Sequence, residues 1–180
     1  KIEDFEIMPE LREAVFTIAC DVDNPFSGER GAARVYAAQK GADESMIREL
    51  DEGLKHFSEI ITIHTGQEID VVPGAGAAGG LGGALLAFLH AVLKPGVQVI
   101  LDAIGFLEKI NGADLVITGE GKMDKQTAMG KTPYGVLKAA TEKGIPVIAI
   151  AGAIEDREIL ETLGFKHILP IHPEGLPEAE

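Results

Sequence analysis

The sequence predicts a mixed α/β protein built around a mainly parallel sheet, and two observations support this fold class. After Lys94-Pro95-Gly96, short apolar runs alternate with longer amphipathic stretches. This is the order that parallel strands joined by right-handed helical crossovers produce. Within this part, Leu115-Val116-Ile117-Thr118 is a compact apolar run, which is typical of a strand buried on both faces.

The composition is that of a globular protein with an acidic surface. Of the 180 residues, 46% are hydrophobic and 25% are charged. Sixteen basic and 29 acidic residues give a formal net charge of −13, which argues against a nucleic-acid or anionic-membrane surface. The single cysteine, Cys20, cannot form an internal disulfide, and no apolar run reaches the length of a membrane span. A cytoplasmic protein is expected, and the lack of an initial methionine suggests a fragment.

Three elements are expected in the first part of the chain: a strand at 14–19, a short helix at 32–39, and a long amphipathic helix that begins at Asp43 or Ser45. Cys20-Asp21-Val22-Asp23-Asn24-Pro25 follows the strand. The spacing of these residues supports two interpretations equally. It is a plain turn, or Asp21 and Asn24 face a ligand or a hydrated Mg²⁺ at the end of the strand.

The glycine-rich tract from Gly74 to Gly83 follows a possible extended run at 69–72 and Pro73. It contains the pattern G-x-G-x-x-G at Gly74, Gly76 and Gly79, with Asp102 downstream at roughly the distance of a ribose contact. This match to a dinucleotide-binding loop is weak, because no clear strand–helix–strand unit surrounds it. The alternative is that small residues allow a helix to pack closely against its neighbour.

Lys94-Pro95-Gly96 is the best candidate for an internal boundary. The elements expected after it are strands at 97–101, from Leu115, at 146–151 and at 167–170, helices at 103–110, 133–143 and 156–163, and a further helix beginning at Glu178-Ala179.

The segment from Gly112 to Lys131 holds the densest group of candidate functional residues. The strand from Leu115 is expected to end in a turn at Gly119-Glu120-Gly121, which places Glu120 at the C-terminal end of the sheet, where open α/β sheets bind ligands. Lys122, Asp124, Lys125, Gln126 and Thr127 follow, and Thr132 and Pro133 are expected to cap and open a helix. Residues 151–153 should lie beside 119–121.

Three stretches resemble the bacterial-type glycerate kinase family: GADLVITGEGKMDKQTAMGKTPYGV at 112–136, ACDVDNPFSGERGAARVYAAQKGA at 19–42, and VPGAGAAGGLGGALLAFL at 72–89. Within 112–136 the departures from the family's usual residues are Lys122 in place of Arg and Met123 in place of Ile. Lys122 keeps the charge but lacks the two-pronged geometry of a guanidinium.

The resemblance implies ATP-dependent phosphorylation of D-glycerate by a two-lobed enzyme of roughly twice this length. In that enzyme a flavodoxin-like domain is formed from N- and C-terminal segments, with a second α/β domain inserted between them. Residues 1–95 would then be part of the inserted domain, with its glycine-rich loop, and 96–180 the C-terminal portion of the flavodoxin-like domain. The N-terminal half of the enzyme has no counterpart in this chain and is its expected partner.

The resemblance also suggests roles for individual residues. Asp124 is expected to orient the glycerate hydroxyl or accept its proton, and Glu120 or Asp21 to help hold Mg²⁺. Lys122 and Lys131 are expected to offset phosphate charge in a reaction that relies on positioning and charge neutralisation. The residues expected to bind substrate or nucleotide are Asn24, Gly74, Gly76, Gly79, Gly80, Gly119, Gly121, Gln126 and Thr127.

Two other functions are considered. The chain is a non-catalytic ligand-binding or assembly module, or it is a dinucleotide-binding oxidoreductase that uses the loop at Gly74. The kinase hypothesis adds one spatial expectation, that the acid-and-amide segment after Thr118 and the glycine-rich tract line a common crevice that binds small anions.

Overall fold

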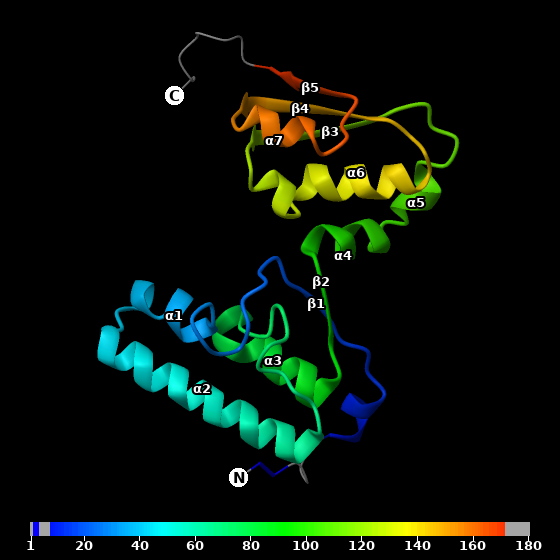
Figure 1. Cartoon of the computed structure of the whole chain (residues 1–180). Coiled ribbons are helices and arrows are strands. Elements are labelled where there is room, and N and C mark those ends of the chain that lie inside the picture. Colours follow the sequence, from blue (N-terminus) through cyan, green and yellow to red (C-terminus); the bar gives the residue numbers. More distant parts are fainter. Residues whose placement is uncertain (1, 4–7, 172–180) are drawn as a thin grey trace. The chain divides into compact units, whose positions relative to one another are not determined.

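The computed structural model describes residues 2–3 and 8–171, and the chain divides into two compact units, Lys1–Gly96 and Val97–Glu180 (Figure 1). No helix among the described residues is long and apolar enough to cross a membrane. The expected helix at Glu178-Ala179 and part of the N-terminal segment lie outside the described residues. The assignment of the two units to an inserted and a flavodoxin-like domain stays a prediction.

The first unit is mainly helical. Its elements, in order, are the 3₁₀ helix η1 (Pro9–Arg12), β1 (Thr17–Ala19), α1 (Ala32–Tyr36), η2 (Ala38–Lys40), α2 (Glu44–Thr65), α3 (Ala77–Leu89) and β2 (Val92–Lys94). The strands β1 and β2 pair in parallel, with Thr17 opposite Val92 and Ala19 opposite Lys94. The strand β2 was not expected from the sequence.

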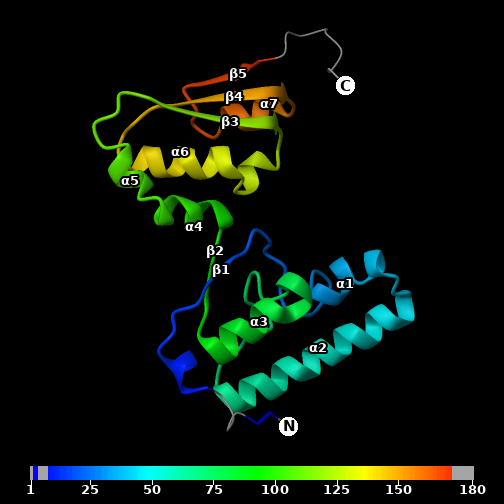
Figure 2. The same cartoon turned by 180° about the vertical axis from the view of Figure 1, so that it is seen from behind.

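The long helix α2 begins where its sequence predicts. The Asp43 side chain accepts hydrogen bonds from the backbone N–H groups of Ser45 and Met46, and Gly66 ends the helix in the left-handed conformation. Figures 1 and 2 show α3 alongside α2. The core of this unit is fully buried at Phe26, Ile61, Ile69, Ala75 and Ala87.

The region before the glycine-rich tract differs from the expectation. Residues 69–72 do not form a strand, because Asp70 and Val71 lie in a turn and Ile69 is buried in the core. The helix α3 contains three successive residues in left-handed backbone conformation, Ala78, Gly79 and Gly80, so its regular part starts after them. The left-handed conformation is unfavourable for Ala78, because this residue has a Cβ.

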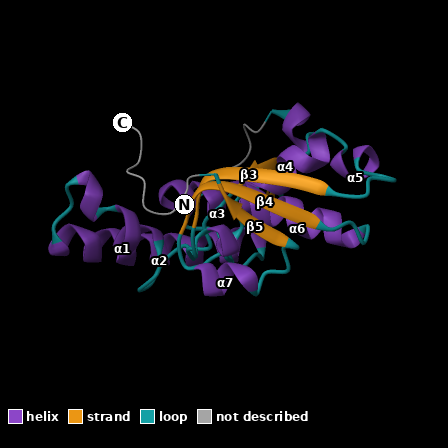
Figure 3. Ribbon diagram, turned by 90° about the horizontal axis from the view of Figure 1, so that it is seen from above, coloured by secondary structure: helices purple, strands orange, loops and turns teal. Residues whose placement is uncertain are grey.

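The second unit contains a three-stranded parallel sheet with the strand order β3-β4-β5. Its elements are α4 (Gly96–Ala103), α5 (Phe106–Lys109), β3 (Val116–Met123), η3 (Thr127–Met129), α6 (Thr132–Glu142), β4 (Val147–Ile154), α7 (Arg157–Glu161) and β5 (His167–Pro170). Figure 3 shows the three strands side by side. The predicted fold class, a mixed α/β protein with parallel sheets, is confirmed.

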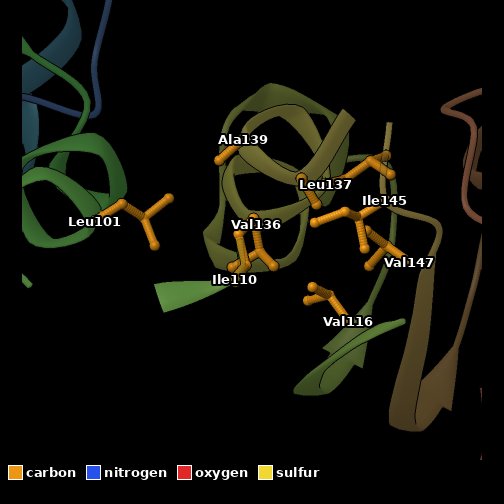
Figure 4. Close-up of a cluster of buried hydrophobic side chains, with 9 residues drawn as sticks. Leu101, Ile110, Val116, Val136, Leu137, Ala139, Ile145 and Val147 are labelled. Carbon is orange, nitrogen blue, oxygen red and sulfur yellow. The ribbon is translucent and has the colours of Figure 1, made fainter. Parts of the chain in front are cut away.

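Helix α6 covers one face of this sheet. Its apolar residues Val136 and Leu137 belong to a buried cluster that includes Val116 of β3 and Val147 of β4 (Figure 4). Helix α7 packs Leu160 against Ala149 and Ala151 of β4. Burying one large aliphatic side chain contributes about 1.5–3 kcal/mol, so these clusters fix the sheet on its helices.

The opposite face of the sheet is more open. Ile117 of β3 is 62% exposed and Leu169 of β5 is 48% exposed, and both alternate with buried neighbours. Parallel sheets normally have both faces covered. Leu115-Val116-Ile117-Thr118 was expected to be buried on both faces, and in the described part of the chain it is buried on one.

Two expectations in the second unit are wrong. Residues 97–101 form helix α4 and not a strand, because Val97 packs against Gly135 of α6, where an added Cβ would lie 2.5 Å from Val97 Cγ1. The strand β3 continues to Met123, and neither Gly119 nor Gly121 has a positive φ, so no turn forms there.

The start of α6 also differs from the expectation that Thr132 caps it. Thr132 is the first residue of α6 and Lys131 is the capping position, with no side-chain cap bond.

Candidate functional site

The C-terminal end of β3 carries a compact group of polar side chains, here named the Lys131 cluster: Glu120, Asp124, Thr127 and Lys131. Lys131 Nζ lies 3.7 Å from Glu120 Oε1 and 3.9 Å from Asp124 Oδ1. The side chains of Glu120 and Asp124 are 24% and 18% exposed, and that of Lys131 is 37% exposed. One ammonium group therefore lies between two partly buried carboxylates at the sheet edge where ligands bind in this fold class.

Thr127 connects the two acids. Its side chain is fully buried, its hydroxyl donates to Glu120 Oε2 at 3.3 Å, and the same hydroxyl oxygen accepts from the backbone N–H of Asp124 at 3.2 Å. The backbone N–H of Thr127 donates to the carbonyl of Asp124 at 2.9 Å. Because Thr127 is buried and committed to these bonds, it fixes the separation of Glu120 and Asp124.

Two further polar residues of the segment, Gln126 and Lys122, lie beside the Lys131 cluster. The backbone N–H of Gln126 donates to Asp124 Oδ1 at 2.8 Å, which closes a local turn around that carboxylate. Lys122 Nζ pairs with Glu155 Oε1 at 2.8 Å, and both side chains are exposed. Both cationic side chains of the expected set are thus paired with carboxylates that an incoming anion would have to replace.

Directly after β4 lie two acids that were not predicted as site residues, Glu155 and Asp156. The backbone N–H of Glu155 donates to the carbonyl of Met123 at 2.8 Å, and Asp156 Oδ2 accepts from the backbone N–H of Lys125 at 3.1 Å. The expected proximity of 151–153 to 119–121 is confirmed, since Glu120 lies opposite Ala151 and Lys122 opposite Ala153. Extending the expected pairing of the two strands toward their C-terminal ends would have found both acids.

The two glycines of β3 do not form the expected turn and have a different structural role. A Cβ on Gly152 of β4 would lie 2.5 Å from the carbonyl oxygen of Gly121, so the two backbones approach closely there. A Cβ on Gly119 would lie 3.1 Å from the carbonyl oxygen of Ile150. At the end of β3, glycine therefore permits close contact between β3 and β4.

In the first unit, Asn24 is the centre of a second group, here named the Asn24 network: Asn24, Arg30, Tyr36 and Gly76. Tyr36 donates its hydroxyl to Asn24 Oδ1 at 2.6 Å, and Asn24 Nδ2 donates to the carbonyl of Arg30 at 2.9 Å. The backbone N–H of Gly76 donates to the carbonyl of Asn24 at 2.9 Å. Burial raises the pKa of Tyr36 above 10.0, and the nearby Cys20 and Asp23 raise it further.

Asp21 follows β1 and is held by a backbone group. Its Oδ1 accepts from the N–H of Gly96 at 2.8 Å, and a Cβ on Gly96 would lie 3.0 Å from Asp21 Oδ2. Cys20 continues the β1–β2 ladder by donating its N–H to the carbonyl of Lys94 at 2.8 Å. The carboxylate of Asp21 therefore lies at the C-terminal ends of β1 and β2.

The glycine-rich tract packs directly on the segment that carries Asn24. A Cβ on Gly76 would lie 2.2 Å from the carbonyl oxygen of Pro25, and one on Gly80 would lie 2.9 Å from the Phe26 ring. Gly74 approaches Leu93 and the Cys20 thiol in the same way. Gly79 differs, because it is exposed and an added Cβ would meet nothing within 4 Å. Close packing, the simpler alternative, accounts for three of the four candidate glycines.

The structure around Gly74 does not support the dinucleotide-binding hypothesis. The residues immediately before Gly74 form turns and not the strand that a βαβ fingerprint needs. Asp102, expected near a ribose, lies in α4 and accepts a hydrogen bond from Gln98 Nε2 at 2.7 Å.

Within residues 2–3 and 8–171, no group of three or more His, Cys, Asp or Glu side chains is arranged to hold a metal ion by itself. Glu120 and Asp124 are suited to a cation that keeps most of its waters, as Mg²⁺ does. The expectation that the acid-and-amide segment after Thr118 and the glycine-rich tract line one crevice stays a prediction.

The chain is an α/β protein with acids and amides at the C-terminal ends of its parallel strands, which is where open α/β sheets bind ligands. The chain belongs to the glycerate kinase family, whose sequence profile matches residues 1–179. It is 54% identical over 154 residues to a protein named glycerate kinase from Halalkalibacterium halodurans, covering 86% of this chain and 40% of the relative. It is 48% identical over 148 residues to the glycerate 2-kinase of Escherichia coli, covering 82% and 39%. The family resemblance is confirmed.

A solved structure agrees with these relatives. A crystal structure described as glycerate kinase 2 from Salmonella typhimurium LT2 superposes with a TM-score of 0.74 at 40% sequence identity, covering 88% of this chain and 41% of that chain. The chain thus spans about 40% of the length of these relatives.

Proposed function

We propose that this chain forms part of a glycerate kinase, a phosphotransferase with an alcohol group as acceptor that moves a phosphoryl group from ATP to D-glycerate. The observation that supports this most directly is the Lys131 cluster, where one ammonium lies between two partly buried carboxylates at the end of a parallel strand. The names of the relatives supply the substrate class.

In this proposal Asp124 orients the attacking hydroxyl and accepts its proton. Its carboxylate is already oriented, because Oδ1 accepts from the Gln126 N–H and the Asp124 N–H donates to Thr127. A fixed carboxylate next to the substrate hydroxyl supplies general-base catalysis without further reorganisation. Gln126 keeps its expected role as a hydrogen-bond donor to substrate, whereas Thr127, being buried, acts through Glu120.

Lys131 and Lys122 offset phosphate charge. Lys131 lies beyond hydrogen-bond distance of both carboxylates, at 3.7 and 3.9 Å, so it can turn toward an anion without losing a short contact. Lys122 gives up one exposed pair with Glu155, which costs little at the surface. The charge-neutralising groups that phosphoryl transfer requires are therefore present on this chain.

ATP and Mg²⁺ are the proposed cofactors, and the donor set of this chain fits them. Mg²⁺ supplies charge neutralisation when bound, and Glu120 or Asp21 would help to hold it through few direct oxygen contacts. Asn24 orders the loop that Gly76 packs on. Gly79, exposed and left-handed, remains a position where a ligand can approach the backbone.

The remaining segment of the enzyme is the proposed partner, and the open face of the β3-β4-β5 sheet is where we expect it to pack. Ile117 and Leu169 expose aliphatic surface on this face. The relatives are more than twice as long as the matched region.

The test combines binding with reconstitution. The purified 180-residue chain is titrated by calorimetry with Mg·ATP, D-glycerate and NAD, and it is then co-expressed with the remaining segment of the Halalkalibacterium relative. We expect weak Mg·ATP or glycerate binding by the chain alone and glycerate phosphorylation by the reconstituted pair.

Each alternative has its own outcome in this experiment. Ligand binding without turnover in a reconstituted, folded pair would support the non-catalytic module. NAD binding would support the oxidoreductase. Reconstitution with no phosphorylation of D-glycerate and no ligand binding would contradict the kinase proposal.

A further inference from the structure

Asp156, at the junction of β4 and α7, has an unusual backbone conformation for its position. Its φ and ψ are 47° and 39°, in the left-handed region that residues with a Cβ avoid. It occupies the N-cap position of α7, where an aspartate normally has an extended backbone and bonds the first N–H groups of the helix with its side chain. Here the side chain makes no cap bond.

The side chain is used elsewhere. Asp156 Oδ2 accepts from the backbone N–H of Lys125 at 3.1 Å, across 31 residues of sequence. Lys125 lies between Asp124 and Gln126 in the segment that follows β3. Asp156 thus has an unfavourable backbone conformation and makes no cap bond to α7, while its carboxylate contacts the neighbouring loop. Strained residues of this kind concentrate at functional sites.

The contact bears on the position of the Asp124 carboxylate. The other bonds that shape this turn are local: Asp124 Oδ1 accepts from Gln126 N–H, Asp124 carbonyl accepts from Thr127 N–H, and Thr127 Oγ1 accepts from Asp124 N–H. These bonds define the shape of the turn, and the Thr127 hydroxyl holds its far end on β3 by donating to Glu120 Oε2. Asp156 attaches the tip to the end of β4.

We infer that Asp156 is a positioning residue that holds the turn at Asp124–Gln126, and through it the Asp124 carboxylate, in the orientation needed for proton acceptance. The inference rests on the proposed function for its catalytic consequence. The attachment of the loop is a property of this chain alone. Small displacements of a catalytic group can lower turnover by about a hundredfold.

Three substitutions separate the side-chain contact from the backbone strain. Asp156→Asn keeps an acceptor oxygen and the tolerance for the left-handed region. Asp156→Gly removes the acceptor and relieves the strain. Asp156→Ala removes the acceptor and raises the strain, because alanine tolerates the left-handed region less well than aspartate does. Glu158→Gln, on α7, is the matched control for loss of one negative charge on the same helix.

The first measurement is amide hydrogen exchange of the 180-residue chain by NMR. We expect exchange at Lys125 to accelerate about tenfold in Asp156→Gly and Asp156→Ala, with Ala149 and Ala151 in the core of β4 unchanged. Asp156→Asn and Glu158→Gln should stay close to the parent. If the Gly variant protects Lys125 as well as the parent does, the attachment is wrong.

The second measurement is steady-state kinetics of the reconstituted enzyme. We expect kcat to fall by about tenfold to a hundredfold in the Gly and Ala variants with little change in KM, and to be restored in Asp156→Asn. Accelerated exchange with unchanged kcat would overturn the positioning role. A parent that never phosphorylates D-glycerate would instead count against the proposed function, while the exchange data would still decide whether Asp156 holds the turn.

Discussion

The Asn24 network and the Lys131 cluster differ in how tightly their polar groups are held. The Asn24 side chain makes two hydrogen bonds of 2.6 and 2.9 Å, and its backbone makes a third of 2.9 Å to Gly76. Lys131 lies 3.7 and 3.9 Å from its two carboxylates, outside hydrogen-bond distance. The first arrangement is a scaffold whose groups bond one another at short distance, whereas in the second the Lys131 ammonium stays near two carboxylates without a short contact to either.

This comparison makes Asp124 the residue with the largest expected effect on turnover. Asp124→Asn keeps the size and the Gln126 contact but removes the proton acceptor, so kcat of the reconstituted enzyme should fall by about 10²- to 10⁴-fold. Steady-state kinetics checks this, with Asp114→Asn, an exposed aspartate before β3, as the control. Turnover equal to that of the parent would move the general base elsewhere.

The scaffold side of the comparison is tested by Gly76→Ala. A Cβ there would lie 2.2 Å from the carbonyl oxygen of Pro25, so the free energy of unfolding of the first unit should fall by about 3 kcal/mol. Urea denaturation followed by NMR signals from α2 measures it.

Gly53→Ala is the matched control for this change, because Gly53 lies within α2 and an added Cβ would meet nothing within 4 Å. It should stabilise the protein by about 0.5–1 kcal/mol. A Gly76→Ala protein as stable as the parent would show that the tract and the Asn24 segment are not in tight contact.

Tyr36→Phe tests the same scaffold more gently. Loss of the 2.6 Å bond to Asn24 should lower the free energy of unfolding by about 1 kcal/mol. The unfolded chain ionises first because the pKa of Tyr36 is raised in the folded state. The stability from neutral Tyr36 is therefore fully present below about pH 10 and is lost as pH rises through the folded-state pKa.

Alkaline unfolding of the parent and of Tyr36→Phe, with tyrosinate absorbance as the second signal, measures this effect. Tyr134→Phe is the control for the other tyrosine, which lies in α6. An identical alkaline transition in the parent and in Tyr36→Phe would show that burial of this hydroxyl does not affect stability.

The smallest effect is expected at Lys131. Because its ion pairs are long and partly exposed, Lys131→Gln should change the free energy of unfolding by less than about 1 kcal/mol. Urea denaturation at low and at moderate salt checks both the size and the screening. A loss comparable to that of Gly76→Ala would show that the Lys131 cluster is a scaffold as well, and the contrast would disappear.

Much of the architecture was predictable where local signals agreed with packing. The Asp43 cap and helical apolar spacing defined α2, and β5 lies at the predicted residues. Residues 97–101 were misassigned because a short apolar run fits a strand or a buried helix equally well, and contact with Gly135 decides the matter. The extension of β3 through Gly119 and Gly121 depends on pairing with β4, which glycine's low strand propensity hides.

The candidate site was predictable in its composition more than in its contacts. Acids and amides after a buried strand indicated Glu120, Asp124 and Thr127, and the structure brings these together. Asp156 was missed because β4 was expected to end earlier, at Ala151. The burial of Thr127 and the mutual satisfaction of Asn24 and Tyr36 depend on tertiary contacts that no local pattern specifies.

The approach of Gly152 to the carbonyl of Gly121 has a consequence for the gene that encodes this chain. Any base change in a glycine codon that alters the amino acid introduces a larger residue, and at position 152 even the smallest replacement collides with the adjacent strand. No amino-acid replacement at this position therefore avoids a steric cost. Drift at the end of β4 must therefore proceed through the residues around Gly152, while the position itself stays fixed for as long as the two strands remain paired.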